Sequence, residues 1–305
     1  MDQLITILGP TASGKTTLAA NLAALINGEI ISADSRQLYR GMDIGTGKDI
    51  GEYIVNGTEI PHHLIDILDP GTRYNVFEYM AEFNNAYKSI IENNRFPILC
   101  GGSGMYLDAV LRGYQMSKVT KNSKLREQMN GWSTENLVKK LKSYGPLHNI
   151  SDISDVKRLI RAIEIADYQS QNRDNEVSLP KFTSMNFGIS YDRSEIRLRI
   201  TERLSSRLSD GLVGEVEGLL KMGIVEEDLI YYGLEYKFVT MYVTGKISYD
   251  SMFTQLNTAI HQFAKRQMTW FRRMEKKGVK IYWIDGSIDI VDKLAVILHQ
   301  LKRGN

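Results

Sequence analysis

Residues 4–16 read LITILGPTASGKT, an apolar run followed by a glycine-bounded loop that ends in lysine and threonine. The loop from Gly9 to Thr16 matches the pattern G-x-x-x-x-G-K-[ST], whose glycines let successive backbone N–H groups point inward at a phosphate. The apolar run Leu4–Leu8 predicts a buried strand, and a helix is expected from Lys15 to about Ile26. This context indicates a phosphate-binding loop, but it specifies neither ATP nor hydrolysis.

The chemistry of this loop suggests which residues hold the phosphates. The helix N-terminus adds partial positive charge, Lys15 supplies a cation, and the Thr16 hydroxyl suits Mg²⁺. A glycine-rich turn that binds nothing is the alternative, and the strand and helix on either side argue against it. The expected diphosphate-binding residues are Gly9, Pro10, Thr11, Ala12, Ser13, Gly14, Lys15 and Thr16.

Beyond this loop, apolar runs alternate with amphipathic stretches along the chain, which predicts an α/β fold with a parallel sheet flanked by helices. Further strands are expected at Glu29–Ser32, Leu64–Leu68, Pro97–Cys100, Asn186–Tyr191 and Val279–Ile284. Further helices of this part are expected at Val76–Asn93, Ser194–Asp210, Val213–Met222, Glu235–Val243 and Tyr249–Lys276.

The middle of the chain lacks a convincing strand. Its short helices are expected at Ser123–Asn130, Ser133–Ser143 and Ser154–Gln169, with serine at or near each start to cap free N–H groups, and Gln169–Ser178 is expected to be a loop. The expected organisation is a P-loop α/β core in two parts, 1–118 and 186–305, with an all-helical insertion domain at 119–185.

Composition narrows the class of protein. The chain has 305 residues, 43% of them hydrophobic and 24% charged, with a net charge of +2, which is ordinary for a globular protein. The apolar runs are shorter than the ~18 residues of a membrane span, and the first residues lack the cationic start of a signal peptide. The single cysteine, Cys100, excludes an internal disulfide, which is typical of a cytoplasmic protein. We expect Cys100 to be buried in a strand.

Two acidic residues are candidates for the site. Asp34 follows the second expected strand at the sheet edge where ligands bind, so it is either a base or Mg²⁺ contact, or a turn residue. Asp66 lies in the segment PHHLIDILDP and is a candidate for an indirect role at Mg²⁺. The adjacent His62 and His63 would point to opposite faces of a strand, so a structural role is expected for most of this segment.

Two segments concentrate basic residues. Residues 261–280 hold seven Lys or Arg and one Glu, with Trp270 and Phe271 among them, which suits a nucleic-acid backbone or a solvated helix face with inward aromatics. In Ser194–Asp210, three arginines lie one residue before Ile200, Leu204 and Leu208 of an apolar stripe, so they either bind a diphosphate or pair with surface acids. The candidate residues are Arg199, Arg203 and Arg207 on that helix, and Lys265, Arg266, Arg272 and Arg273 in the basic segment.

Several motifs in order resemble the tRNA dimethylallyltransferase (tRNA isopentenyltransferase) family across nearly the whole chain. They are GPTASGKT, SADSRQLYRGMDIGTGK, PHHLIDILDP, PILCGGSGMYL, VKRLIRAIE and AKRQMTWFRR. The resemblance implies transfer of a dimethylallyl group from dimethylallyl diphosphate to the exocyclic amine of the adenosine 3′ of the tRNA anticodon. It implies Mg²⁺ as cofactor and the tRNA anticodon stem-loop as partner; a monomer is expected.

The resemblance also implies residue roles. Asp34 would be the base, with Lys15, Thr16, Arg199 and Arg203 assisting the departure of diphosphate. The implied tRNA contacts are Asp34, Ser35, Arg36, Gln37, Ser103, Arg126, Val156, Lys157, Arg158, Leu159 and Ile160. Ser103 stands where the family usually has threonine, and GTGKD stands where GTAKP is usual. A small-molecule P-loop kinase, an isopentenyltransferase acting on free adenine nucleotides and a non-catalytic RNA-binding protein are the alternatives.

Overall fold

The structure, a computed structural model, describes residues 3–114, 116–145, 155–171, 176–177 and 179–304. The chain forms two compact units: Met1–Gly113 with Leu179–Asn305, here called the core unit, and Tyr114–Ser178, here called the insertion unit. Strand β9 (Thr183–Ser190) belongs to the core unit. The boundary expected at residue 185 therefore falls inside a core strand, because the early polar residues of that strand lack the apolar pattern used to find it.

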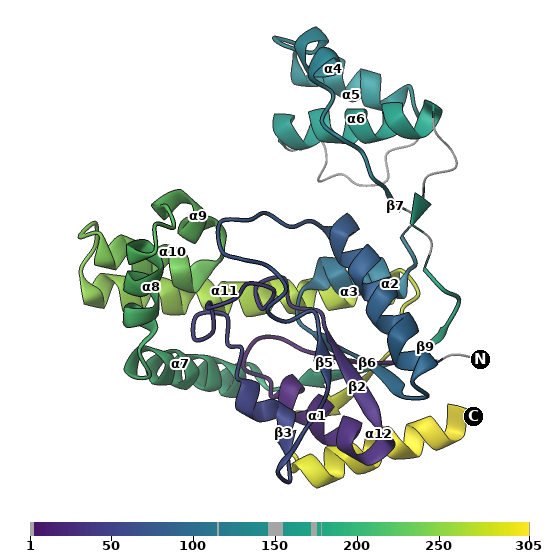
Figure 1. The fold of residues 1–305 in the computed structure, drawn as a ribbon, viewed down its shortest axis with the longest axis vertical. Coiled ribbons are helices and arrows are strands. Elements are labelled where there is room, and N and C mark those ends of the chain that lie inside the picture. The colour runs from purple at the N-terminus through teal and green to yellow at the C-terminus, as the bar shows by residue number, and fades with distance from the viewer. Residues whose placement is uncertain (1–2, 115, 146–154, 172–175, 178, 305) are drawn as a thin grey trace. The chain divides into compact units, whose positions relative to one another are not determined.

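The core unit is built on a parallel sheet (Figure 1). In spatial order its described strands are β10 (Ile281–Asp285), β9, β1 (Gln3–Leu8), β6 (Phe96–Gly101), β2 (Gly28–Ser32) and β5 (His62–His63). β1 is central and pairs with both β9 and β6. A strand buried on both faces reads as a continuous apolar run, which is why Leu4–Leu8 was recognisable.

Helices cover this sheet. The described helices of the core unit are α1 (Lys15–Ile26), α2 (Val76–Glu92), α3 (Gly104–Leu111), α7 (Arg193–Ser209), α8 (Leu212–Lys221), α9 (Glu226–Tyr231), α10 (Leu234–Val243), α11 (Tyr249–Lys276) and α12 (Ile290–Gly304). A 3₁₀ turn, Ile50–Tyr53, leads into a small hairpin of β3 (Ile54–Val55) and β4 (Thr58–Glu59). The predicted α/β class is thus confirmed. The helices α3, α9 and α12 were not predicted.

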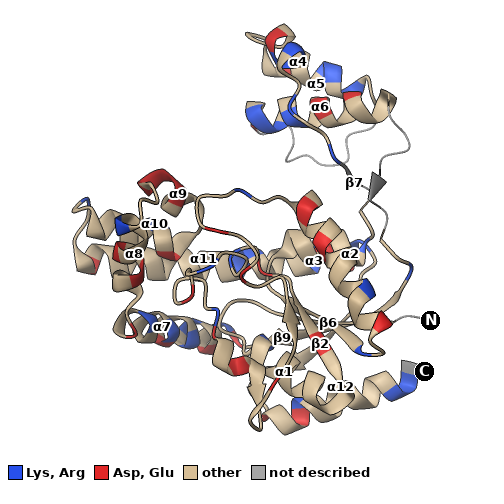
Figure 2. Cartoon of the chain, in the orientation of Figure 1, with Lys and Arg blue, Asp and Glu red and all other residues tan. Residues whose placement is uncertain are grey.

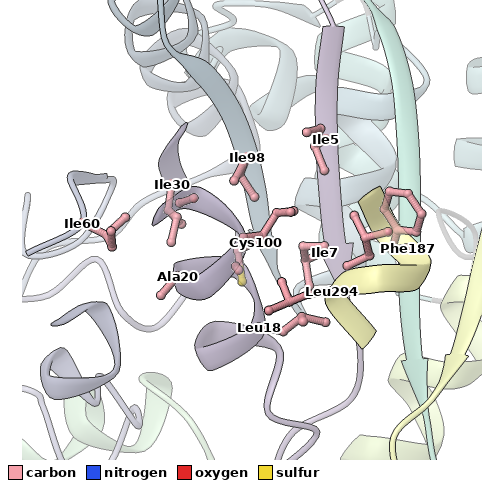
Figure 3. Packing of buried hydrophobic residues seen from close by; sticks show 14 of the residues in the cluster. Ile5, Ile7, Leu18, Ala20, Ile30, Ile60, Ile98, Cys100, Phe187 and Leu294 are labelled. Atoms are coloured by element: carbon pink, nitrogen blue, oxygen red, sulfur yellow. The ribbon is translucent and has the colours of Figure 1, made fainter. Parts of the chain in front are cut away.

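The apolar core beneath α1 explains why this part folds as it does. Ile5 and Ile7 of β1 alternate with their neighbours, so they point to one face, where they pack with Leu18 of α1 and Leu294 of α12 (Figure 3). Cys100 of β6 lies in the same cluster and is buried, as expected. Burial raises the pKa of its thiol to about 12, so the thiol stays protonated and unreactive.

The strand expected at Leu64–Leu68 is wrong. The extended segment is the shorter β5, which pairs with Ile30 and Ile31 of β2. Leu64 has φ 61° and Asp66 has φ 53°, both in the left-handed region, so the chain turns directly after His63. The apolar alternation that suggested a strand therefore reflects single side chains, such as buried Leu64, that point inward from a turn.

The insertion unit has its own core. Its described helices are α4 (Ser123–Gln128), α5 (Thr134–Lys142) and α6 (Val156–Gln171). Met129, Leu137, Leu159 and Ile163 form its buried centre. The Ser133 hydroxyl caps α5 by accepting from the N–H of Asn136 at 3.3 Å, as the sequence suggested.

Two details of this unit differ from expectation. Asn122, not Ser123, caps α4, since its side chain accepts from the N–H of Leu125 at 3.1 Å. The unit is not all-helical, because β7 (Met116–Ser117) and β8 (Glu176–Val177) form a short antiparallel pair. The expected helix start at Ser154 lies outside the described residues. Within the described part of the chain, no helix is both long and apolar enough to cross a bilayer.

Candidate active site

The loop between β1 and α1 has the shape that a phosphate-binding loop needs. Ala12 and Gly14 have φ 62° and 74°, so the backbone turns in the left-handed region just before α1 starts at Lys15. A Cβ on Gly9 would lie 2.6 Å from the Ser13 Oγ and 3.3 Å from the Ile189 carbonyl oxygen, so glycine avoids crowding at the first loop position. The buried Ser13 hydroxyl has no hydrogen-bond partner among the described residues, which leaves a polar group available in the loop.

A cavity of about 1010 Å³ opens against this loop, entirely within the core unit. It is lined by the predicted loop residues from Thr11 to Thr16, by Asp34 to Gln37 and by Ser103. Arginines of α7 and aromatic residues of α9 and α11 complete its wall. The structure therefore brings together residues that the sequence placed in four separate motifs.

Lys15, at the start of α1, and Asp34, after β2, both line this cavity, although β6 separates β1 from β2 in the sheet. Burial lowers the pKa of the Lys15 ammonium, and the negative charge of Asp34 counteracts that shift. The Lys15 Nζ lies 3.5 Å from the Pro10 carbonyl oxygen, so the side chain folds back over the loop. A partly buried cation near a carboxylate in a cavity is a typical arrangement for binding and activating a charged substrate.

The structure shows Asp34 in a turn and also in the cavity wall, and its role as a base or Mg²⁺ contact stays a prediction. Its Oδ1 accepts a hydrogen bond from the N–H of Arg36 at 3.0 Å, so it is a turn residue. It also lines the cavity beside Lys15. The turn uses one carboxylate oxygen of Asp34 as an acceptor, and the carboxylate remains in the cavity wall.

The residues after Asp34 are held from within the protein. The Ser103 Oγ accepts from the N–H of Ser35 at 2.9 Å, so the hydroxyl of this residue supports the turn that carries Asp34. Gln37 is buried, its Oε1 accepts from Ser32 at 3.2 Å, and its Nε2 donates to the Gly47 carbonyl at 3.0 Å. Each end of its amide makes one internal hydrogen bond, and Gln37 also lines the cavity, so the tRNA contact implied for it stays a prediction.

Arginines of α7 line the cavity at one-turn spacing, visible as blue along α7 in Figure 2. The Arg199 Nε donates to the Ala12 carbonyl at 3.0 Å, so this arginine lies directly against the phosphate loop. The Arg203 Nη2 donates instead to Asp49 at 2.9 Å. The sequence left open which arginine meets the diphosphate, and the contact with the loop favours Arg199.

Arg207, the third arginine of this series, is buried rather than at the core boundary. Its Nη1 lies 3.4 Å from the Glu235 carboxylate, and its Nε has no hydrogen-bond partner among the described residues. Burial lowers the pKa of Arg207 and raises the pKa of Glu235. The sequence indicated Glu235 only as the start of an expected helix, so its place in the cavity wall was missed.

Other lining residues also escaped the sequence analysis. Glu52 accepts from the Thr17 hydroxyl at 3.0 Å beside the loop, and no local pattern singles it out. Tyr231 lies in the unpredicted helix α9, with the Arg36 guanidinium 5.5 Å from its ring centre. Phe263 was within the basic segment, where its aromatic ring could have been counted with Trp270 and Phe271.

The basic segment falls largely on α11 and matches the expected helix face with inward aromatics, while its nucleic-acid role stays a prediction. Phe271 is fully buried, whereas Lys265, Arg272 and Arg273 are exposed. Arg266 lines the cavity. Aromatic packing inward therefore coexists with an exposed cationic face.

In the insertion unit, the implied tRNA contacts divide by burial. Lys157, Arg158 and Val156 are exposed. Leu159 is fully buried in the centre of the unit, and Ile160 packs beside it. The implied contact through the Leu159 side chain needs correction, because the four-residue apolar spacing that builds α6 turns this position inward.

Arg126 also has an internal role. Its Nε and Nη2 donate to the buried Glu164 carboxylate at 2.7 and 3.0 Å, and Arg161 donates to the same group at 3.1 Å. Although burial itself raises the pKa of Glu164, these bonds and one from the N–H of Asn122 lower it to about 2. The cluster ties α4 to α6.

Asp66 lies away from the loop. Its carboxylate pairs with the buried Lys48 ammonium, which also contacts Asp43 at 2.6 Å. Asp66 is not among the described residues that line the cavity, so the indirect Mg²⁺ role expected for it lacks a structural basis. His62 and His63 have different partners, the Ile60 carbonyl at 3.0 Å and Glu29 at 2.6 Å, which agrees with structural roles.

The residues at the loop suit Mg²⁺ held jointly with a phosphate. Thr16 offers a hydroxyl and Asp34 a carboxylate at one wall of the cavity. Among the described residues, no group of three or more His, Cys, Asp and Glu converges on one point. Mg²⁺ is commonly bound through one or two protein oxygens together with substrate phosphates and water, so this donor set fits it.

Comparisons with known proteins agree with this architecture. A family model described as IPP transferase matches residues 37–274. The tRNA dimethylallyltransferase 2 of Bacteroides fragilis is 54% identical over 299 residues, covering 98% of this chain and 98% of that protein. The tRNA dimethylallyltransferase 2 of Porphyromonas gingivalis is 54% identical over 295 residues, covering 97% and 98%.

Solved structures agree as well. The tRNA isopentenylpyrophosphate transferase of Bacillus halodurans matches with a TM-score of 0.72 and 30% identity, covering 100% of this chain and 96% of that one. A eukaryotic dimethylallyltransferase acting on tRNA shares the fold, with a TM-score of 0.76, 22% identity and coverage of 94% and 74%. The resemblance suggested by the motifs is confirmed, and the chain belongs to the IPP transferase family.

Proposed function

We propose that this protein transfers the dimethylallyl group of dimethylallyl diphosphate to the exocyclic N6 amine of the adenosine 3′ of the anticodon in tRNA. The observation that carries the proposal is that Asp34 and the phosphate loop line one cavity. A base and a diphosphate site are the two requirements of this reaction. The names of relatives more than half identical over nearly their whole length support the same activity.

The reaction forms a bond between N6 and the first carbon of the allyl group, and it breaks the bond from that carbon to the diphosphate oxygen. An exocyclic adenine amine is a poor nucleophile, because its lone pair is delocalised into the ring. Asp34 accepts the proton that the amine loses, which is general base catalysis. The products are N6-dimethylallyladenosine and diphosphate.

The leaving diphosphate accumulates negative charge that the loop neutralises. Lys15, loop N–H groups other than that of Thr11, and Arg199 stabilise this charge, and Arg203 adds positive charge farther along α7. Mg²⁺, when bound at the Thr16 hydroxyl, supplies further electrostatic stabilisation of the phosphate oxygens.

The acceptor must enter the same cavity. A base that reacts inside a pocket has to leave its stack, and aromatic rings then replace the stacking it loses. Tyr231, Phe263 and Trp270 provide such rings in the cavity wall. The filled cavity excludes water, which protects the allylic carbon from hydrolysis. We place this activity in the cytoplasm, in a monomer.

The test uses radiolabelled dimethylallyl diphosphate with either tRNA or AMP as acceptor, with and without ATP. Label should pass to tRNA alone and without ATP. Label in AMP would identify an isopentenyltransferase of free nucleotides. A strict ATP requirement would identify a kinase, and RNA binding without transfer would identify a non-catalytic protein.

A further inference from the structure

One polar residue interrupts the buried face of α11. The buried positions of this helix are Met252, Leu256, Ile260, Ala264, Gln267, Phe271 and Met274. Gln267 is 6% exposed, so its amide has been removed from water. Burying an amide is unfavourable unless both its donor and its acceptor find partners. Its contacts therefore indicate what the position is for.

Both ends of the amide bind backbone near the phosphate loop. The Gln267 Oε1 accepts from the N–H of Thr11 at 2.9 Å, and its Nε2 donates to the carbonyl of Gly102 at 2.9 Å. Thr11 is the third residue of the loop, and Gly102 directly follows β6. A single side chain thus joins α11, the loop and the end of a central strand.

The fit around this bridge leaves little room. A Cβ on Gly102 would lie 2.5 Å from the Gln267 Nε2 and 3.1 Å from the Gly9 carbonyl oxygen. Gly102 therefore has to be glycine for the amide to reach it. Gly102, in the motif PILCGGSGMYL, therefore allows the amide to pack against the loop.

We propose that Gln267 is a positioning residue that holds the phosphate-binding loop in the shape that binds diphosphate. The inference rests on the proposed function and deepens it. The N–H of Thr11 is committed to Gln267 and is not offered to a phosphate, so the amide anchors the start of the loop. An anchored loop does not have to be ordered when the ligand arrives, and this raises affinity.

The test compares Gln267→Met with Gln267→Glu. Methionine matches the glutamine in length but removes both hydrogen bonds at every pH. A protonated glutamic acid can accept from Thr11 and donate to Gly102, as glutamine does, whereas the ionised form cannot donate. Binding of inorganic diphosphate is measured by calorimetry at pH 5.5 and at pH 8.5, on the full chain with Mg²⁺ present. Wild type is titrated beside each variant at each pH. The effects of protonation of the ligand and of cavity groups such as Lys15 then cancel in the ratio of the two affinities.

We expect Gln267→Met to bind diphosphate about tenfold more weakly than wild type at both pH values, as the loss of about 1.4 kcal/mol would give. Gln267→Glu should approach wild-type affinity at pH 5.5 and fall below the methionine variant at pH 8.5, where its charge also repels the ligand. Charge repulsion alone would leave the methionine variant equal to wild type. That result would overturn the inference.

The same two changes at Gln255 provide the matched control. Gln255 lies on the exposed part of α11, where its Nε2 donates to Ser251 at 2.7 Å, and its variants should bind like wild type. Should Gln267→Met fail to fold, the amide proton of Thr11 in the ligand-free wild type gives an independent measurement. Slow hydrogen exchange at Thr11 supports the bridge, and exchange as fast as in an open loop refutes it.

The outcome also separates this inference from the proposed function. If the wild-type protein does not bind diphosphate, both the proposed function and the positioning role of Gln267 are contradicted. If the wild-type protein and Gln267→Met bind diphosphate with equal affinity, only the positioning role of Gln267 is contradicted.

Discussion

Asp34 has one oxygen in a turn and lines a reactive cavity, so its two roles can be separated by substitution. Asparagine keeps the oxygen that accepts from the N–H of Arg36 but cannot accept a proton. Asp34→Asn should therefore lower the rate of prenyl transfer by about 10²–10⁴-fold, the usual contribution of a general base. Its affinity for inorganic diphosphate should stay within about twofold of wild type. Single-turnover transfer and calorimetry measure the two quantities, and near-wild-type turnover would exclude Asp34 as the base.

The lowered pKa of Glu164 predicts how the stability of the insertion unit depends on pH. Its pKa is lowered to about 2 in the folded protein, below the ordinary value of 4.5. A lowered carboxyl pKa stabilises the fold above pH 4.5, and this contribution is lost as the pH falls from 4.5 toward 2. Glu164→Gln should cost the insertion unit roughly 1–3 kcal/mol at neutral pH and should remove most of this pH dependence. Urea unfolding of fluorotryptophan-labelled protein, followed at Trp132, measures it.

At the scale of elements, α11 presents two faces with different tasks. Its buried face packs apolar residues and carries Gln267, while Lys265, Arg272 and Arg273 are exposed. Contacts between such cations and RNA phosphates release counterions, which makes affinity fall log-linearly with salt. The segment 261–280 has a net charge of +6 in a chain of +2, so it is the strongest candidate for these contacts.

Reversing the charge of Lys265, Arg272 and Arg273 to glutamate should weaken the binding of all tRNAs to a similar degree. It should also flatten the salt dependence, by roughly one unit of log–log slope for each phosphate that the variant no longer neutralises. Anisotropy titrations at several salt concentrations measure both effects. The same reversal at the exposed residues Lys88, Lys302 and Arg303 changes the net charge equally and should have a smaller effect. Equal effects of the two triple variants would show that α11 is only a solvated surface.

The whole molecule consists of two units whose apolar centres share no residue. The cluster around Ile5 and Ile7 is built from the core unit, and the cluster around Leu159 from the insertion unit. The cavity at the phosphate loop, where we propose that diphosphate binds, is lined by core residues alone. Diphosphate binding and part of the tRNA binding are therefore expected to be separable.

Replacing residues 114–178 by a short glycine–serine linker should leave inorganic diphosphate affinity within about threefold of wild type, because every residue lining that cavity remains. Affinity for tRNA should fall by more than about tenfold, since the exposed Lys157 and Arg158 are removed with the unit. Calorimetry with diphosphate and anisotropy with tRNA test the two halves of this prediction. Unchanged tRNA affinity would show that the insertion unit does not contribute to tRNA binding.

Local sequence by itself determined the phosphate loop, the strands around it and most of the helices. A loop bounded by Gly9 and Gly14 directly after an apolar strand encodes its own conformation, because glycine spacing and backbone hydrogen bonding act over a few residues. The motif order also identified the family and placed Asp34 at the sheet edge. The strand expected at Leu64–Leu68 failed, because alternation of apolar residues does not distinguish a strand from a turn with one buried side chain.

Only the tertiary structure decided which distant groups meet. The Gln267 amide reaches Thr11 across 256 positions, and Arg207 meets Glu235 across 28. Such pairs depend on how helices pack on the sheet, and packing depends on the whole set of buried surfaces rather than on any one segment. For the same reason Leu159, which a motif placed at the tRNA, is buried in the insertion unit. Periodicity reports that a residue lies on one face of its helix, and only the folded chain shows what that face contacts.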